Sequence, residues 1–120
     1  MTKKNEMILL IYLIGKYERG DCLQISYRNK QIRKICTVAK DAEKAYGKEM
    51  AEKIHLRIDQ ISAADSVETM IVLKIGRCHP LHGDRKGQFA LDLIHPYRLV
   101  FEKTGEEIQI VKIMEIVDYH

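Results

Sequence analysis

The sequence predicts an α+β fold, with an N-terminal strand and two helices packed on a small antiparallel β-sheet. The 120 residues are enough for one small domain. Residues 23–27 alternate apolar and polar side chains, as a half-buried strand does. Apolar residues then recur every three or four positions across 42–61, which indicates an amphipathic helix. Alternation returns across 89–102 and continues toward the C-terminus, which predicts a run of antiparallel strands.

Two helices are expected between the first strand and the later ones. Asn29 is a suitable N-cap for the first helix. Its apolar side consists of Ile32, Ile35, Cys36 and Ala39. Asp41 is expected to cap a second, longer helix, in which an internal Gly47 costs about 1 kcal/mol relative to alanine. The apolar stripe of that helix consists of Ala42, Tyr46, Met50, Ile54, Ile58 and Ile61. Residues 62–66 end the helix, and residues 66–70 are expected to add a short helical turn.

The rest of the chain is predicted to form strands. The expected strands are 71–79, 88–93, 97–102 and one from 108 to the C-terminus, with turns at His95-Pro96 and 103–106. Within the third of these strands, Tyr97, Leu99 and Phe101 alternate with polar neighbours. If these three side chains face the core, Arg98 faces away from it.

The composition excludes several classes of protein. Hydrophobic residues make up 46% and charged residues 31%, which is typical of a folded domain and not of a disordered chain. The net charge of +3 permits binding to nucleic acid without requiring it. The cysteines are Cys22, Cys36 and Cys78. Their odd number and wide spacing favour neither a disulfide framework nor a cysteine zinc site, so we expect reduced, buried thiols in a cytoplasmic protein.

An unbroken apolar run, Met7–Ile14, stands near the N-terminus. It is far shorter than the roughly 20 residues needed to span a bilayer, so no membrane association is expected. The charged stretch Lys16-Tyr17-Glu18-Arg19 follows where a signal peptide would have small residues. The run is therefore interpreted as a buried strand or a short helix.

Side chains suited to RNA cleavage are concentrated in two places. In that reaction the 2′-hydroxyl attacks the adjacent phosphorus while a base removes its proton, an acid protonates the departing 5′-oxygen, and cations stabilise the phosphoryl charge. Residues 77–87 hold two histidines, His79 and His82, and three permanent cations. The second place is the end of the chain, residues 118–120, and Arg98 lies between the two. Each feature also has an ordinary structural explanation, as a loop, a solvated turn or a frayed end.

These segments resemble the HigB-type toxins of the RelE superfamily, the plasmid maintenance system killer family. Residues 79–88, His-Pro-Leu-His-Gly-Asp-Arg-Lys-Gly-Gln, resemble that family's segment His-Pro-Leu-Lys-Gly-Asp-Arg-Lys-Gly. Residues 97–101, Tyr-Arg-Leu-Val-Phe, are similar to its Trp-Arg-Ile-x-Phe strand, and the chain ends on Asp118-Tyr119-His120 as that family does. The resemblance spans residues 23–120, with the three motifs in matching order and spacing.

The resemblance implies a RelE-like fold and the function of a ribosome-dependent mRNA endonuclease, the toxin of a type II toxin–antitoxin system. His79, Asp118 and His120 would be its acid–base and orienting groups, Tyr119 would stack on a base, and Arg98 would hold the scissile phosphate. The expected RNA contacts are His82, Arg85, Lys86, Lys30, Arg33 and Lys34. Lys40 would join the last three in facing ribosomal RNA. The implied partners are mRNA, the ribosome and a helix-turn-helix antitoxin similar to HigA. The chemistry requires no cofactor and no metal.

The sequence departs from the family in three respects. His82 replaces a lysine, so the charge there is not fixed. Phe89 replaces the common tryptophan, which is a milder change. Residues 1–22 precede the family's usual start, which falls near Leu23. Either translation begins near Leu23 in the natural protein, or residues 1–22 form an added strand or helix that covers an apolar patch or forms a homodimer.

Two other functions are compatible with the sequence. One is a protein of the RelE/ParE fold that binds gyrase or an antitoxin without cutting RNA. The terminal His120 argues against it, because ParE-type relatives generally lack that residue. The other is a metal-binding module built on His79 and His82 with His95 or His120. The His-x-x-His spacing across a proline is unremarkable, and no cysteine pair supports such a site.

Overall fold

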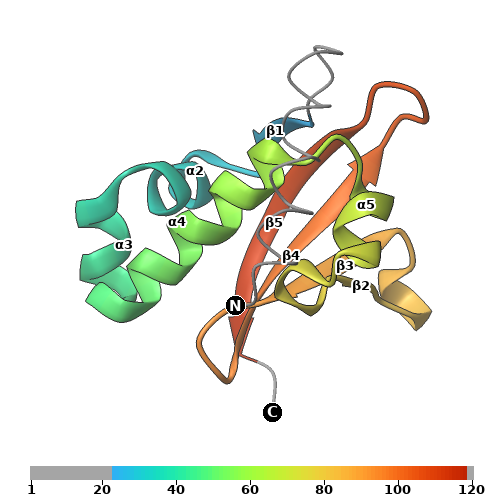
Figure 1. Ribbon diagram of the computed structural model, residues 1–120. Coiled ribbons are helices and arrows are strands. Elements are labelled where there is room, and N and C mark those ends of the chain that lie inside the picture. Colours follow the sequence, from blue (N-terminus) through green and yellow to red (C-terminus); the bar gives the residue numbers. More distant parts are fainter. Residues whose placement is uncertain (1–22, 119–120) are drawn as a thin grey trace, which may run out of the picture.

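The computed structural model describes residues 23–118, while residues 1–22 and 119–120 lie outside the described part (Figure 1). The elements are β1 (Gln24–Tyr27), α2 (Lys30–Thr37), α3 (Ala39–Tyr46), α4 (Lys48–Ala63), α5 (Val67–Val72), the 3-10 helix η1 (Ile75–Arg77), β2 (His79–Pro80), the 3-10 helix η2 (Gly83–Arg85), β3 (Gln88–Asp92), β4 (Tyr97–Thr104) and β5 (Ile110–Asp118). The predictions made for residues 1–22 as a separate segment therefore fall outside this range.

The strands of residues 23–118 form one five-stranded sheet in the order β1-β5-β4-β3-β2. The pairs β2 with β3, β3 with β4, and β4 with β5 are antiparallel. β1 joins the edge parallel to β5, from Gln24 beside Ile110 to Tyr27 beside Ile113. The expected α+β layout is confirmed, with one refinement. The sheet is mixed, because β1, the first strand of the chain, pairs in parallel with β5, the last one.

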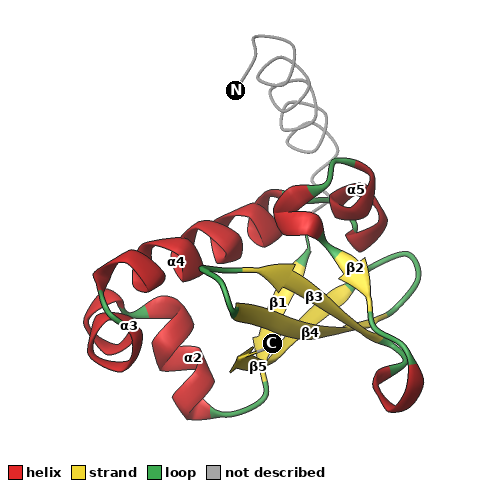
Figure 2. Cartoon of the chain, turned by 90° about the horizontal axis from the view of Figure 1, so that it is seen from below, coloured by secondary structure: helices red, strands yellow, loops and turns green. Residues whose placement is uncertain are grey.

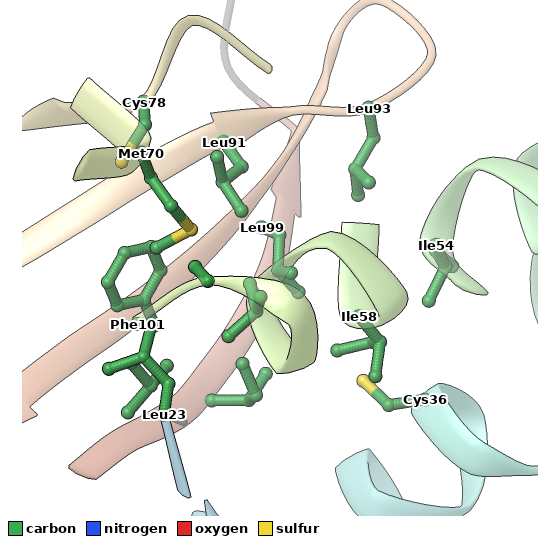
Figure 3. Close-up of a cluster of buried hydrophobic side chains, with 14 of the residues drawn as sticks. Leu23, Cys36, Ile54, Ile58, Met70, Cys78, Leu91, Leu93, Leu99 and Phe101 are labelled. Carbon is green, nitrogen blue, oxygen red and sulfur yellow. The ribbon is translucent and has the colours of Figure 1, made fainter. Parts of the chain in front are cut away.

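The core lies between α4, α5 and one face of the sheet. Leu91, Leu99 and Phe101 face the helices from the sheet, and each is fully buried. Ile54 and Ile58 approach from α4, and Met70 of α5 lies beside the Phe101 ring (Figure 3). Each of these large side chains contributes about 1.5–3 kcal/mol on burial. The apolar stripe predicted for the longer helix is confirmed as the buried one, with Tyr46 half-exposed at its edge.

The prediction of one long helix after Asp41 was wrong, because Gly47 divides it into α3 and α4. Gly47 has φ 90° and ψ 166°, which no helix accommodates and which glycine adopts at little cost. Its N–H closes α3 on the Glu43 carbonyl at 2.8 Å, and its own carbonyl accepts from Ala51 at 3.0 Å to begin α4. Val38, not Asp41, is the cap residue of α3. The Asn29 cap is confirmed, since its Oδ1 accepts from the Ile32 N–H at 2.9 Å.

The strand predicted across 71–79 was also wrong. Ser66 caps α5, as its hydroxyl accepts from the Thr69 N–H at 3.0 Å, and that helix continues to Val72. Lys74, Gly76 and Arg77 then have φ values of 56°, 55° and 52°, and this left-handed backbone prevents an extended strand. Only His79–Pro80 remain as β2. The β-branched residues 71 and 72 are helical because packing overrides their strand preference.

The turn predicted at His95-Pro96 is confirmed, whereas the one predicted at 103–106 begins two residues later, because Lys103 and Thr104 belong to β4. The His95–Pro96 peptide bond, which is cis, joins β3 to β4. Gly105, with φ 86°, begins the connection from β4 to β5. Of the helices in residues 23–118, none has the length and apolar character required to cross a membrane.

Candidate functional site

The face of the sheet opposite the helices carries the polar side chains. Directly paired residues of neighbouring strands share a face, so the register places Asp92, Arg98 and Val117 in one row. The adjacent row contains His79, Ala90, Val100 and Glu115. Leu91, Leu99 and Phe101 alternate with these residues and face the helices. His79 and Arg98 therefore reach the same open face from two different strands.

The spacing of the two rows sets how far His79 and Arg98 stand apart. β3 lies between their strands, so the two backbones are about 10 Å apart across the sheet. They are offset along the strands by about 7 Å, which is two residues. Both side chains are long enough to converge on one bound phosphodiester group between them.

The ring of His79 is oriented by a single backbone contact. Its Nδ1 lies 2.7 Å from the carbonyl oxygen of Arg77. A carbonyl oxygen only accepts, so Nδ1 must carry the proton of this hydrogen bond. Nε2 is then the nitrogen left for proton transfer. The carbonyl contact therefore decides which ring nitrogen carries the proton.

Arg98 is held beside an acidic partner. Its Nε lies 3.5 Å from Asp92 Oδ1, and its side chain is 30% exposed. The same carboxylate forms an ion pair with Arg77, whose Nε donates to Oδ2. The backbone carbonyl of Asp92 accepts from Arg57 Nε of α4 at 2.8 Å. Asp92 thus joins two guanidinium groups on the open face, and α4 fixes its main chain from the other side.

The η2 turn lies on the open side of the sheet, away from α4 (Figure 2). Arg85 of this turn forms an ion pair with Glu115 at 2.5 Å and donates to Gln88 Oε1 at 3.3 Å. The ion pair therefore spans β3 and β4, and Glu115 lies in the same register row as Ala90 and Val100. Both of these residues are fully buried although they lie on the open face. His82 and Lys86 flank Arg85 and are exposed.

The cationic residues of α2 lie apart from this face. Lys30, Arg33 and Lys34 are exposed, and α2 packs against β1, β5, α3 and α4. His79 belongs to β2, at the opposite edge of the sheet from β1. Lys34 lines a shallow pocket of about 200 Å³ between α2 and α3, together with Asp41 and Lys44. The structure therefore presents two separate cationic regions, with Lys40 at the start of α3 beside the second.

The end of β5 does not place Asp118 on the face of His79, with which the resemblance had grouped it. Asp118 pairs with Tyr97 and Val117 pairs with Arg98. Strand alternation puts the Asp118 side chain on the face of Tyr97, opposite the face of Arg98 and His79. Asp118 is exposed. Tyr119 and His120 lie outside the described residues, so the roles predicted for them stay predictions.

The two described cysteines are free and buried, as predicted. Cys78 directly precedes His79, but burial raises the pKa of its thiol to about 12. Burial also raises the pKa of the Cys36 thiol to about 12. Both are neutral thiols near pH 7, which excludes Cys78 as a nucleophile. Within residues 23–118, no three His, Cys, Asp or Glu side chains gather in a way that could hold a metal ion.

Two residues of this face, Asp92 and Glu115, were not predicted, and Arg77 was counted among the cations of residues 77–87 without a role of its own. The alternation of residues 88–93 and 97–102 around a His-Pro turn would have placed Asp92 opposite Arg98, so that signal was present. Nothing in the sequence indicates a left-handed backbone at Arg77, because residues with a Cβ rarely adopt one. The Arg85–Glu115 pair joins residues 30 positions apart and depends on the complete strand order.

A mixed sheet of this order with helices on one face defines a class of fold, that of the YoeB/ParE toxins, which matches the RelE-like fold predicted. The YoeB/ParE toxin from Agrobacterium tumefaciens is similar with a TM-score of 0.58 and 15% identity, covering 82% of this chain and 100% of that one. The YoeB dimer from Staphylococcus aureus gives a TM-score of 0.54 and 20% identity, over 82% of this chain and 97% of that one. The YoeB–YefM complex from Staphylococcus aureus gives 0.53 and 19% over the same shares.

Similarity at this level of identity establishes the fold. No protein-family model and no curated protein matches the sequence. The HigB-type assignment therefore stays a prediction.

Proposed function

We propose that this protein is the toxin of a type II toxin–antitoxin system and cleaves mRNA on the ribosome, as a HigB-type member of the RelE superfamily. The observation that carries the proposal is the His79 ring. Its Nδ1 is held by the Arg77 carbonyl at 2.7 Å, and it shares a face with Arg98. A histidine of fixed tautomer beside an arginine is equipment for phosphoryl transfer, and the toxin fold of the similar structures supports this choice.

In the proposed mechanism, Arg98 holds the non-bridging oxygens of the scissile phosphate. Its planar fork suits two of these oxygens at once, and binding moves its guanidinium away from the Asp92 carboxylate. The 2′-hydroxyl attacks phosphorus as it loses its proton to a base. The bond to the 5′-oxygen breaks, and an acid protonates the departing oxygen. The products are a 2′,3′-cyclic phosphate and a 5′-hydroxyl.

Base and acid are assigned jointly to His79, Asp118 and His120. The free Nε2 of His79 is oriented to accept or donate a proton at the open face. Asp118 emerges on the other face of β5, so it acts at this site only by way of the residues that follow it. Tyr119 is proposed to stack on a base next to the cleaved bond.

Substitution of His79 tests this proposal. His79→Ala should abolish growth inhibition and the cutting of ribosome-bound mRNA. His82→Ala is the matched control, since it removes an exposed histidine three positions away and should weaken RNA binding without abolishing cleavage. If His79→Ala and His120→Ala both leave cutting intact, the assignment is wrong. Residues appended after His120 should impair activity more than a tag at the other terminus.

The proposed partners are mRNA, the ribosome and a helix-turn-helix antitoxin similar to HigA, all in the cytoplasm. His82, Lys86 and Arg85 would contact the mRNA backbone. Lys30, Arg33, Lys34 and Lys40 would face ribosomal RNA from the second cationic region. Two of the similar structures are a YoeB–YefM complex and a YoeB dimer, which supports testing for both an antitoxin and a homodimer. Co-expression with the protein encoded by the neighbouring gene should abolish growth inhibition.

The alternatives for residues 1–22 are tested by mass spectrometry of the untagged native protein. A native N-terminus at Met1 would rule out a start near Leu23. In that case, light scattering of the full chain and of a chain starting at Leu23 tests the homodimer, which should be lost in the shorter chain.

A second candidate function is inhibition of DNA gyrase without RNA cleavage. One similar structure is described as a YoeB/ParE toxin, which makes this candidate specific enough to test. Purified protein that blocks supercoiling by gyrase and leaves ribosome-bound mRNA whole would favour it over the endonuclease.

A further inference from the structure

The loop before β2 has an unusual backbone. Within four residues, Lys74, Gly76 and Arg77 all have positive φ values, between 52° and 56°. Glycine adopts this conformation readily, but a residue with a Cβ retains it only where its surroundings hold it. At Arg77 the N–H donates to the Lys74 carbonyl at 3.3 Å. Two further contacts, one to its carbonyl and one from its side chain, also hold it.

Both of these contacts lead into the candidate site. The Arg77 carbonyl accepts from His79 Nδ1 at 2.7 Å, which fixes the tautomer of that ring. The Arg77 guanidinium forks over the carboxylate of Asp92, with Nε on Oδ2 and Nη2 on Oδ1 at 3.5 Å. That same Oδ1 lies 3.5 Å from Arg98 Nε. A continuous path therefore runs from His79 through Arg77 and Asp92 to Arg98.

In the Arg77–Asp92 ion pair, geometry restrains the Arg77 side chain more than burial does. The Arg77 side chain is 68% exposed, so a simple Coulombic contact would be weak. A forked guanidinium on a carboxylate, however, fixes the direction of the side chain as well as its distance. The backbone carbonyl of Asp92 accepts from Arg57 Nε at 2.8 Å, so the main chain that carries this carboxylate is tied to α4. An anchored side chain constrains the backbone of its own residue, and with it the carbonyl that His79 contacts.

We propose that Arg77 is a positioning residue for RNA cleavage: its Asp92-anchored left-handed backbone holds the carbonyl that keeps His79 in the Nδ1–H tautomer, in fixed relation to Arg98. This inference rests on the proposed function for its role in cleavage. The tautomer itself is a property of the protein without RNA, and it is measured independently.

The test is NMR of the intact chain labelled with ¹⁵N at its histidine side chains. Wherever the ring is neutral, wild-type His79 should show the Nδ1–H tautomer. Arg77→Ala should shift the ring toward a mixture of both tautomers and change the pH profile of cleavage. The cleavage rate constant should fall about tenfold while KM changes little, within the roughly 10²–10⁴-fold contribution of acid–base catalysis. Asp92→Asn, which leaves Arg77 in place, should shift the tautomer in the same way.

Lys74→Ala is the matched control, because Lys74 has the same left-handed backbone and its side chain takes no part in the contacts among His79, Arg77 and Asp92. It should leave the His79 tautomer and the pH profile unchanged. Arg77→Gly, which favours positive φ, should retain more of the wild-type tautomer than Arg77→Ala.

An unchanged tautomer in both Arg77→Ala and Asp92→Asn would overturn the inference, as would an equal shift in Lys74→Ala. If the tautomer shifts as expected but the wild-type protein cuts no mRNA, the anchoring of His79 stands and the proposed function fails. The two failures are therefore distinguishable.

Discussion

The Arg85 guanidinium of η2 is paired with the Glu115 carboxylate of β5, across the two strands that separate them. This contact ties the predicted RNA-binding loop to the sheet. It also means that the Arg85 charge is balanced by a carboxylate of the protein before any RNA binds. A phosphate that engages Arg85 competes with Glu115 for this charge.

Glu115→Gln should therefore strengthen RNA binding by releasing Arg85. The slope of log K against log salt should steepen by about 0.7 if one more phosphate of a single strand is contacted. Fluorescence anisotropy with a short RNA over a series of salt concentrations measures both quantities. Glu102→Gln is the control, because it removes the same charge from the same face, where the partner is Gln88 at 3.2 Å. Equal effects of the two substitutions would contradict a specific release of Arg85.

Arg98→Lys should reduce cleavage about 10²-fold, because lysine retains the charge but loses the planar fork that holds two phosphate oxygens. The loss should fall on the rate constant at saturating ribosomes, with RNA affinity little changed. Single-turnover cleavage of ribosome-bound mRNA measures it. Arg33→Lys makes the same chemical change on the exposed side of α2 and should leave the rate constant unaltered. A loss of binding with an unchanged rate constant would assign Arg98 to RNA affinity only.

Gly76→Ala should destabilise the fold. Gly76 has φ 55°, which costs about 1–2 kcal/mol for a residue with a Cβ. An added Cβ would also meet Arg57 Nε at 2.8 Å and Leu91 Cδ2 at 3.2 Å, so it would disturb the bond from Arg57 to Asp92. Gly83→Ala, at φ 69° and with open space around it, carries only the backbone cost. Urea unfolding should therefore give a lower free energy of unfolding for Gly76→Ala than for Gly83→Ala. The reverse order would contradict the close packing of Gly76 against Arg57 and Leu91.

The stability of the protein should fall as pH rises above about 9. Burial raises the pKa of the Cys78 thiol from its usual value of 9.0 to about 12. The pKa of the Cys78 thiol is higher in the folded protein than in the unfolded one. Its contribution to the free energy of unfolding is therefore complete below pH 9 and is lost as pH rises toward 12. Urea unfolding at pH 8 and at pH 10.5 measures this change, and Cys78→Ala should show a smaller loss than the wild-type chain. Iodoacetamide should also modify native Cys78 slowly at pH 8, and rapid labelling would contradict its burial.

Periodicity alone predicted much of this fold. The apolar stripe from Ala42 to Ile61 is the buried face of α3 and α4, and the alternation around Arg98 placed that residue on the open face. The errors arose where backbone conformation depends on tertiary contacts. Gly47 was expected inside a helix and instead separates two helices. Residues 71–77 have strand-forming side chains, but the buried Val67 and Met70 favour a helix, and the left-handed residues that follow exclude a strand.

The candidate site, like the fold, was predicted only in part, because tertiary structure decides which residues meet. His79 and Arg98 were identified from the resemblance, and the register does bring them to one face. Asp118 was grouped with them, but a register that pairs it with Tyr97 directs it to the other face. A sequence shows which residues alternate, whereas the register that decides which of them meet depends on bulges such as the one between Val100 and Phe101.

The proposed reaction is cleavage of ribosome-bound mRNA by 2′-hydroxyl attack. It is measured most directly by the chemistry of the RNA ends after purified protein acts on programmed ribosomes. We expect a 2′,3′-cyclic phosphate on the upstream fragment and a 5′-hydroxyl on the downstream fragment, both absent with His79→Ala. Intact mRNA, or fragments with a 5′-phosphate, would contradict it.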